Sequence, residues 1–236
     1  NNLLRNGAKK IVCIMDENSS EDSRWHTGHD LQKENYSFIL EKGLEIPWLG
    51  VVFKPKKSNT LRKRLGSINN LLMLAEATGR CVLLEESGKY VSSIPAILGG
   101  LIADVTIHGH LSAGTAAIEC ASLGKPTLLI DREGTPFSKL SQLPEGSVVF
   151  KDWGSALIAL INYFKNNKFD SKFGDWTTYI KELDPFDDGR GTYRMSTYIS
   201  SLFDGFNQGL DREKIMTKSA EIYARKWGHD KIITNG

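Results

Sequence analysis

The chain has 236 residues, 40% of them hydrophobic, which is enough to build the core of one large globular domain. Its formal net charge of +2 and sequence pI of about 8.4 do not indicate nucleic acid as the main partner. Three cysteines without metal-ligand spacing indicate buried thiols in a reducing compartment, and no apolar run approaches the roughly 20 residues that cross a bilayer.

The N-terminus carries neither an initiator Met nor the charged-then-apolar pattern of an export signal. We therefore expect a cytoplasmic protein. We interpret the opening residues, Asn1 to Leu4, as the start of a truncated portion of a longer parent.

Short apolar strands alternate with helical segments over most of the chain. Strands are predicted at Ile11–Met15, Trp48–Phe53, Cys81–Leu84, Val105–Ile107, Thr127–Ile130 and Ser147–Phe150. Helices are predicted at Gly28–Lys42, Leu61–Ala77, Ile94–Leu101, Ala116–Leu123 and Trp153–Asn166. This alternation predicts an α/β fold with a Rossmann-like, doubly wound parallel sheet of about six strands.

The last part of the chain lacks strand patterns. A polar turn at Asp184–Gly191 precedes two predicted helices, Thr192–Phe206 and Asp211–Trp227. We therefore predict a Rossmann-like domain over residues 1–170 and a C-terminal helical extension over residues 171–236 that packs on it.

Polar clusters follow four of the predicted strands, where each strand ends. They lie at Asp16–Ser20, Lys54–Lys57, Glu85–Lys89 and His108–Thr115. Ligands of doubly wound sheets bind beyond the carboxyl ends of the strands, so this convergence predicts a ligand site at that edge.

The most informative segment, Ala103–Asp131, is predicted to form a strand, a small-residue turn, a helix and a second strand. The turn before the helix consists of Ser112, Ala113, Gly114 and Thr115. A helix N-terminus gathers about half a positive charge, and small residues there let a phosphate or diphosphate approach the backbone. Glu119 lies one turn beyond Thr115, where a carboxylate can accept hydrogen bonds from ribose hydroxyls. A nucleotide fits this pattern, and the alternative is that the turn only caps the helix.

Two residues at strand ends are candidate catalytic groups. Lys54 is placed to neutralise the charge that grows on a departing nucleotide diphosphate, although a solvated charge run is the alternative, as for Lys56 and Lys57. His108 directly follows a strand, and either it or His110 can donate to a phosphate or sugar hydroxyl, the alternative being a loop histidine that caps the next helix. No other residues support a metal site.

Two arginines in the tail are candidate diphosphate ligands. Arg190 and Arg194 are four residues apart and can reach the diphosphate from a tail folded over the cleft, with Asp187 orienting one of them. The alternative is surface charge with an Asp–Arg pair.

Four segments carry a resemblance to a known family: FKPKK at 53–57, ADVTIHGHLSAGTAAIE at 103–119, LGKPTLLID at 123–131 and DPFDDGRGTYR at 184–194. Together they resemble the C-terminal, nucleotide-sugar-binding half of GT-B fold glycosyltransferases, especially bacterial enzymes of surface and capsular polysaccharide synthesis. The resemblance implies that Ser112, Gly114 and Thr115 hold the donor diphosphate and that Glu119 binds the ribose. It also implies that the loop at about 85–91 contacts the base.

The resemblance implies a hexosyltransferase-like enzyme whose donor substrate is a nucleotide diphosphate sugar, without a further cofactor. The glycan or lipid-linked acceptor then binds an N-terminal domain that this chain lacks and on which the extension also packs. The chain alone is accordingly expected to be inactive, and its parent to be free of transmembrane segments and able to associate peripherally with a membrane.

The resemblance leaves the stereochemistry open. Leu111 stands where many retaining members carry the first of two paired glutamates, the second of which matches Glu119. Two other functions remain open: a UDP-sugar 2-epimerase-like enzyme and a non-catalytic nucleotide-sugar-binding module.

Overall fold

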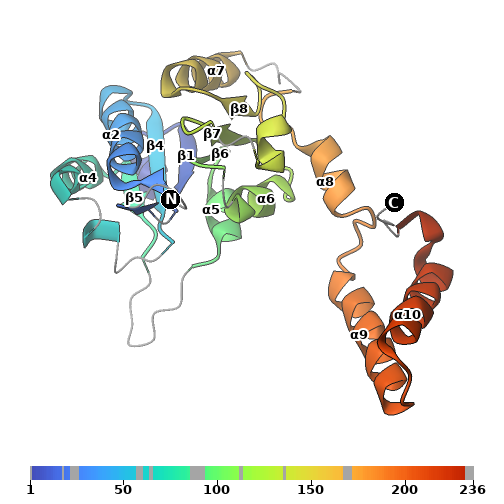
Figure 1. Cartoon of the computed structure of the whole chain (residues 1–236). Coiled ribbons are helices and arrows are strands. Elements are labelled where there is room, and N and C mark those ends of the chain that lie inside the picture. The colour runs from blue at the N-terminus through green and yellow to red at the C-terminus, as the bar shows by residue number, and fades with distance from the viewer. Residues whose placement is uncertain are drawn as a thin grey trace. The chain divides into compact units, whose positions relative to one another are not determined.

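The structure is a computed structural model that describes residues 2–17, 19–21, 27–56, 61–63, 66–85, 94–111, 114–134, 137–166 and 172–231. The chain forms two compact units, Asn1–Ile180 and Lys181–Gly236 (Figure 1). Among the described residues, no helix combines the length and the apolar character needed to cross a membrane.

A six-stranded parallel sheet forms the centre of the first unit. Its strands are β1 (Lys10–Met15), β4 (Leu49–Lys54), β5 (Cys81–Leu83), β6 (Val105–His108), β7 (Thr127–Ile130) and β8 (Val149–Phe150). They pair in the order β5-β4-β1-β6-β7-β8, which is the strand order of a doubly wound Rossmann-like sheet. The predicted fold class is therefore confirmed, and the strand order reverses between β1 and β6.

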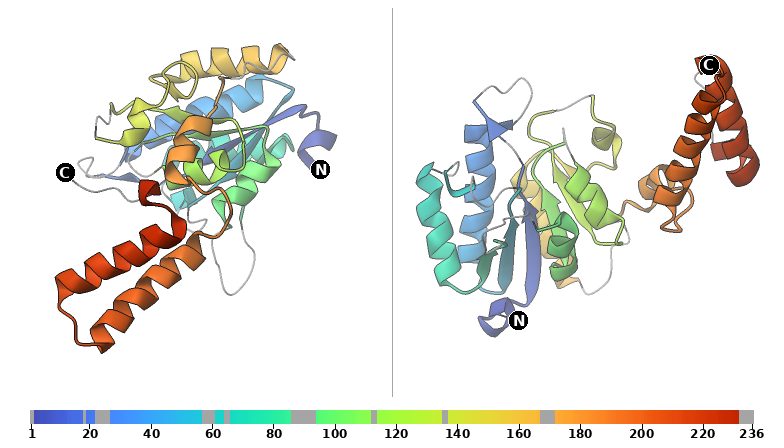
Figure 2. Two further views of the ribbon diagram at one scale, coloured as in Figure 1. Left: turned by 90° about the vertical axis from the view of Figure 1, so that its right-hand side faces the viewer. Right: turned by 90° about the horizontal axis from the view of Figure 1, so that it is seen from below.

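Helices cover both faces of this sheet, as Figure 2 shows. Side chains of α2 (His29–Glu45), α4 (Asn69–Ala77) and α7 (Trp153–Lys165) share one buried cluster with one face of the sheet. Cys120 of α6 (Thr115–Ala121) and Ala96 of α5 (Ala96–Ile102) belong to another cluster, together with Leu3 of α1 (Asn2–Arg5). Successive residues of β1 alternate between the two clusters, because neighbouring strand side chains point to opposite faces.

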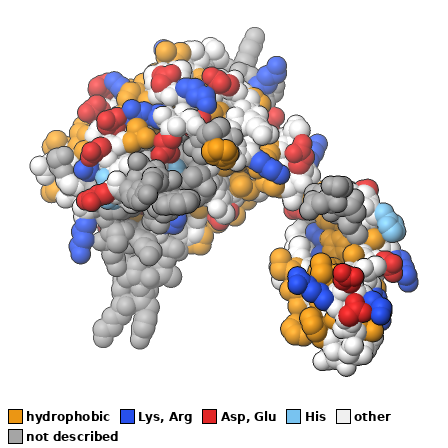
Figure 3. All heavy atoms as spheres, in the orientation of Figure 1, with side chains coloured by type: hydrophobic (Ala, Val, Ile, Leu, Met, Phe, Trp, Pro, Cys, Tyr) orange, Lys and Arg blue, Asp and Glu red, His pale blue; other side chains and the backbone are white. Residues whose placement is uncertain are grey.

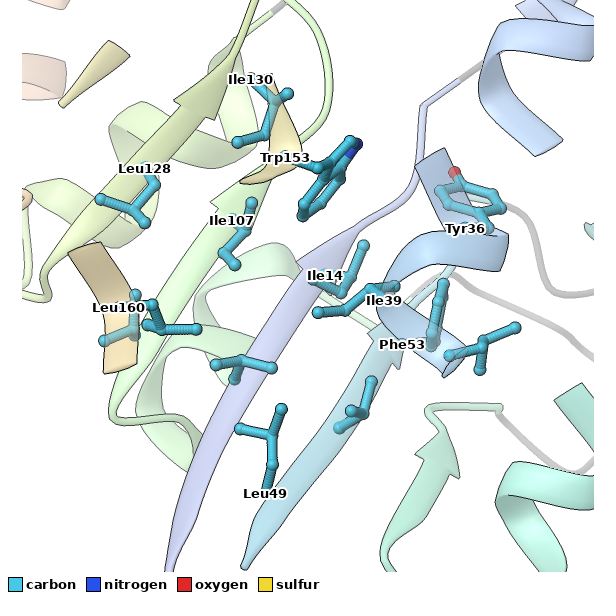
Figure 4. Close-up of a cluster of buried hydrophobic side chains, with 14 of the residues drawn as sticks. Ile14, Tyr36, Ile39, Leu49, Phe53, Ile107, Leu128, Ile130, Trp153 and Leu160 are labelled. Carbon is cyan, nitrogen blue, oxygen red and sulfur yellow. The ribbon is translucent and has the colours of Figure 1, made fainter. Parts of the chain in front are cut away.

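The larger cluster lies between the sheet and the helices α2 and α7. Figure 4 shows Ile14, Ile107 and Leu128 of the sheet pointing toward Ile39 of α2 and Leu160 of α7. These strands are rich in β-branched residues and leucine and are buried on both faces, as expected of a parallel sheet covered by helices.

The helix predicted over Leu61–Ala77 is interrupted in the structure. Residues 61–63 are helical, η1 (Gly66–Ile68) is a short 3-10 helix, and α4 begins at Asn69. Gly66 has a φ of 55°, a left-handed conformation that glycine adopts readily and that does not continue an α-helix.

The sequence did not indicate three short elements of the structure. They are the paired parallel strands β2 (Ser19–Ser20) and β3 (Thr27–Gly28) and the 3-10 helix η2 (Lys139–Gln142).

The first unit continues beyond the expected boundary after residue 170. Phe173 belongs to the larger buried cluster, and the indole N–H of Trp176 donates to the carbonyl oxygen of Thr127 over 2.9 Å. The division between the units falls within α8 (Thr177–Leu183), after Ile180.

The second unit contains the two predicted helices, α9 (Gly191–Asn207) and α10 (Arg212–Trp227), followed by the 3-10 helix η3 (His229–Lys231). The helices α9 and α10 lie side by side in both views of Figure 2. A Cβ at Gly205 would lie 2.8 Å from a side-chain carbon of Ile215, so the glycine permits this close approach. Figure 3 shows hydrophobic side chains on the surface of this unit, and Met195, Phe203 and Phe206 are among its exposed residues.

The contacts of Gly174 yield a stability prediction. Its φ is 64°, and a Cβ there would lie 2.6 Å from the backbone nitrogen of Thr127. Gly146 has a similar φ of 76° but nothing within 4 Å of its Cβ position. We expect Gly146→Ala to cost only backbone strain, about 1–2 kcal/mol. Gly174→Ala should lower the free energy of unfolding by about 1–3 kcal/mol more, because backbone must also move. Urea denaturation of both variants measures the difference in their free energies of unfolding. Equal losses of stability would contradict the expected clash between the new Cβ and the backbone of Thr127.

Candidate functional site

The two predicted catalytic residues lie on opposite sides of β1, at the same level of the sheet. Met15, the last residue of β1, is in register with Lys54 of β4 and with His108 of β6. Both residues therefore stand at the carboxyl edge, next to the point where the strand order reverses. This is where doubly wound sheets bind their ligands.

Lys54 is buried at this edge. Its ammonium donates to the carbonyl oxygen of Pro55 over 2.6 Å. Burial lowers the pKa of Lys54, whereas the negative charges of nearby groups, among them Asp16 and Glu119, oppose this change. The structure thus brings Lys54 within electrostatic range of Glu119, the predicted ribose ligand.

Asp16 joins the segments that follow β1 and β4. Its carboxylate accepts hydrogen bonds from the hydroxyl of Tyr36 and, over 2.9 Å, from the backbone N–H of Lys56. Gln32 donates to the hydroxyl of Tyr36 and to the carbonyl oxygen of Glu17. Two side chains of α2 therefore fix the positions of both segments.

Glu17 lies in one of the predicted polar clusters, but the sequence did not indicate it as a site residue. One carboxylate oxygen lies 2.8 Å from the ammonium of Lys56, and the other lies 3.5 Å from Nε2 of His108. Burial raises the pKa of Glu17, but contact with His108 and Lys56 outweighs it and lowers this pKa to about 2. Glu17 is therefore a buried, ionised carboxylate between two nitrogen groups.

His108 has no exposed surface. Its Nδ1 lies 2.6 Å from the carbonyl oxygen of His110, and because a carbonyl oxygen only accepts, Nδ1 carries the proton of this hydrogen bond. Its Nε2 lies 3.5 Å from a carboxylate oxygen of Glu17, which exceeds a normal hydrogen bond, and none of the described residues satisfies this nitrogen with a hydrogen bond.

His110 connects three loops of the same edge. Its Nδ1 lies 2.8 Å from the hydroxyl oxygen of Thr27 and 3.1 Å from a carboxylate oxygen of Glu133, and the Thr27 hydroxyl also donates to Glu133 over 3.1 Å. Burial lowers the pKa of His110, as does the nearby His108, while Glu133 opposes the shift. His110 thus has a structural role in holding these loops together.

The start of α6 has a packing function as well as any binding function. Gly114 is its N-cap, and a Cβ there would lie 2.2 Å from a side-chain carbon of Leu140. A side chain at position 114 would therefore displace Leu140, which gives this glycine a packing reason irrespective of a ligand. Thr115 and Glu119 are exposed on α6. The predicted diphosphate ligands Ser112 and Ala113 lie outside the described residues, as does most of the predicted base-binding loop at 85–91.

The tail arginines make contacts within the second unit. A guanidinium nitrogen of Arg194 lies 2.9 Å from each carboxylate oxygen of Asp188, and the guanidinium carbon lies 3.7 Å from the ring centroid of Phe186. Asp188 is thus the partner of this arginine, where the sequence suggested Asp187. The guanidinium carbon of Arg190 lies 5.5 Å from the ring centroid of Tyr193. Binding of a diphosphate by Arg190 and Arg194 stays a prediction.

Comparison of the sequence with known protein families and with curated proteins finds no match. Within the described parts of the chain, no group of three or more His, Cys, Asp or Glu residues is arranged to hold a metal ion. The observations that bear on function are therefore the strand order and the group formed by Asp16, Glu17, Lys54, Lys56 and His108, which we name the carboxyl-edge cluster.

The pKa of Glu17 yields a prediction about stability and pH. This pKa is about 2 in the folded chain and ordinarily 4.5. The ionised carboxylate therefore contributes its full stabilisation of the fold at pH values above 4.5. That contribution is lost as pH falls toward about 2. We expect Glu17→Gln to lower the free energy of unfolding by about 1–3 kcal/mol at neutral pH.

Urea denaturation from neutral to acidic pH measures this effect, and the deficit of the variant should shrink as pH falls. The control is Glu145→Gln, which removes an exposed carboxylate from the segment before β8, outside the carboxyl-edge cluster. A deficit that does not change with pH would show that the charge of Glu17 is not its cause.

Proposed function

We propose that this chain is the donor-binding domain of a glycosyltransferase that moves a sugar from a nucleotide diphosphate sugar to a surface polysaccharide or another glycan. The observation that carries this proposal is the position of the carboxyl-edge cluster beside the reversal of strand order. Nucleotides bind at such reversals because the loops that follow the two central strands diverge there.

The charges of the cluster support a diphosphate as the group that binds. Lys54, Lys56 and His108 supply nitrogen groups from two strands and one loop, and Lys54 and His108 are buried. A positive charge that is fixed in a water-poor site acts strongly on a charge that develops in a transition state. A departing nucleoside diphosphate develops negative charge, so Lys54 is proposed to stabilise its departure.

The position of Glu119 supports the proposal that the ligand contains a nucleoside. Its carboxylate is exposed on α6 and its charge acts on Lys54. A group that can accept hydrogen bonds from ribose hydroxyls therefore lies near a group that can neutralise the adjoining diphosphate. Of these two roles, that of Glu119 is implied by the resemblance to GT-B enzymes, and that of Lys54 follows from the charge of the leaving group.

Transfer of the sugar is proposed for a longer parent in the cytoplasm. In the enzymes that this chain resembles, the N-terminal half carries the acceptor site. We accordingly propose that a glycan or lipid-linked acceptor binds there and that this chain by itself binds the donor without turnover.

Nucleotide titration tests the proposal directly. Uridine, cytidine, guanosine and thymidine diphosphates are titrated into the chain by isothermal calorimetry, and we expect one of them to bind with one site per chain. Glu119→Ala and Lys54→Ala should each weaken binding about tenfold or more, because each removes a hydrogen bond or ion pair with a charged group.

The control variant is Glu145→Ala, which should leave the affinity unchanged. The proposal fails if none of the four diphosphates binds. It also fails if one binds but Glu119→Ala and Lys54→Ala have no larger effect than Glu145→Ala.

A further inference from the structure

Glu17 occupies a position that three separate elements build around an anion. The carboxylate lies between Nζ of Lys56, at 2.8 Å, and Nε2 of His108, at 3.5 Å. Glu17 follows β1, Lys56 follows β4 and His108 ends β6. An anion held by both nitrogen groups therefore sits at the point where the strand order reverses.

Among the described residues, one of the two nitrogen groups is left unsatisfied by this arrangement. His108 has no exposed surface, its Nδ1 is committed to the carbonyl oxygen of His110, and none of the described residues is a hydrogen-bond partner of its Nε2. Buried polar atoms of native proteins are nearly always hydrogen-bonded, so this nitrogen calls for a partner that the described residues do not supply. A carboxylate oxygen of Glu17 lies 3.5 Å from this nitrogen, which is farther than a normal hydrogen bond.

The electrostatic environment favours a negative charge at this position. Burial by itself raises the pKa of a carboxyl group, yet the pKa of Glu17 is lowered to about 2 by His108 and Lys56. Among the described residues, the charged or titratable groups around His108 include Glu17, Lys56, His110 and, through His110, Glu133. The same field would stabilise another anion if it replaced the carboxylate.

We propose that Glu17 is an internal competitor of the ligand: its carboxylate occupies a phosphate-oxygen position formed by Nζ of Lys56 and Nε2 of His108, and a phosphate oxygen displaces it on binding. In this proposal the ring of His108 carries a proton on both nitrogens, so that Nε2 donates to the phosphate oxygen. The identity of that ligand as a nucleoside diphosphate rests on the proposed function. The anion position itself rests on the geometry alone.

The arrangement provides an entrance for the displacing group. The side chain of Lys56 is 42% exposed, whereas that of Glu17 is 9% exposed. An anion can therefore meet Lys56 first and then take the place of Glu17 beside His108. A competitor differs from a ligand-binding residue in one measurable respect, because its removal strengthens binding.

Pyrophosphate is the probe that separates these roles. We expect Glu17→Ala to bind pyrophosphate about tenfold more tightly than the unaltered chain, as measured by isothermal calorimetry, because no carboxylate has to be displaced. Glu17→Gln should also bind more tightly, since it removes the charge and keeps the bulk. Adding Lys56→Ala to Glu17→Ala should abolish the gain.

The matched control is Glu45→Ala. Glu45 forms an ion pair with Lys42 at the C-terminal end of α2, outside the cluster. This variant also removes a lysine-paired carboxylate, and its affinity for pyrophosphate should equal that of the unaltered chain.

Thermal unfolding provides a second measurement, which also reports whether each variant folds. Both Glu17 variants should melt at a lower temperature than the unaltered chain and should gain more from added pyrophosphate. Unchanged or weaker pyrophosphate binding by whichever Glu17 variant folds would overturn the proposal.

The two proposals can fail independently. Tighter pyrophosphate binding by the Glu17 variants, with no binding of any nucleoside diphosphate, would uphold the anion position and reject the donor-binding function. Nucleoside diphosphate binding without a gain in the Glu17 variants would uphold the donor-binding function and reject the role of Glu17.

Discussion

Strand β1 pairs with β4 on one side and with β6 on the other, and both registers place a basic or titratable residue beside Met15. This pairing is the constraint on which the candidate site depends. Lys54 and His108 are far apart along the chain, and only two parallel pairings to the same strand bring them to one level. Because all strands of the sheet run in the same direction, every polar segment that follows a strand reaches the same edge.

The carboxyl-edge cluster shows how this edge accommodates buried charge. Removing ionised groups from water is costly unless each meets a partner of opposite charge or a hydrogen bond. Asp16 accepts from Tyr36 and from the backbone of Lys56, and Glu17 faces both Lys56 and His108. Within the described part of this edge, the compensation is incomplete at Nε2 of His108, a buried nitrogen with a charge nearby and no hydrogen bond. Such an incomplete network is what a site that exchanges an internal anion for an external one would require.

The motif DPFDDGRGTYR, which is predicted to bind a ligand, also makes contacts among its own residues. Arg194 is buried against the ring of Phe186 and bonded to both oxygens of Asp188, whose carboxylate also accepts from the backbone N–H of Arg190. Gly189 has a φ of 65°, which suits a turn that brings Asp188 back toward α9. These contacts give several residues of the motif a structural reason within the second unit.

The sequence by itself predicted the six strands of the main sheet, most of the helices and the edge at which polar residues collect, because apolar periodicity and the residues after each strand are local properties. It therefore indicated Lys54 and His108 correctly as residues of one edge. Only the tertiary structure identified Glu17, which in the sequence is one acidic residue in a polar loop, because its partners arrive through strand pairing. The tertiary contacts likewise show that Asp188 and not Asp187 holds Arg194, that Leu140 packs against Gly114, and that Phe173 and Trp176 extend the first unit. Each of these depends on contacts between distant segments, which no local pattern specifies.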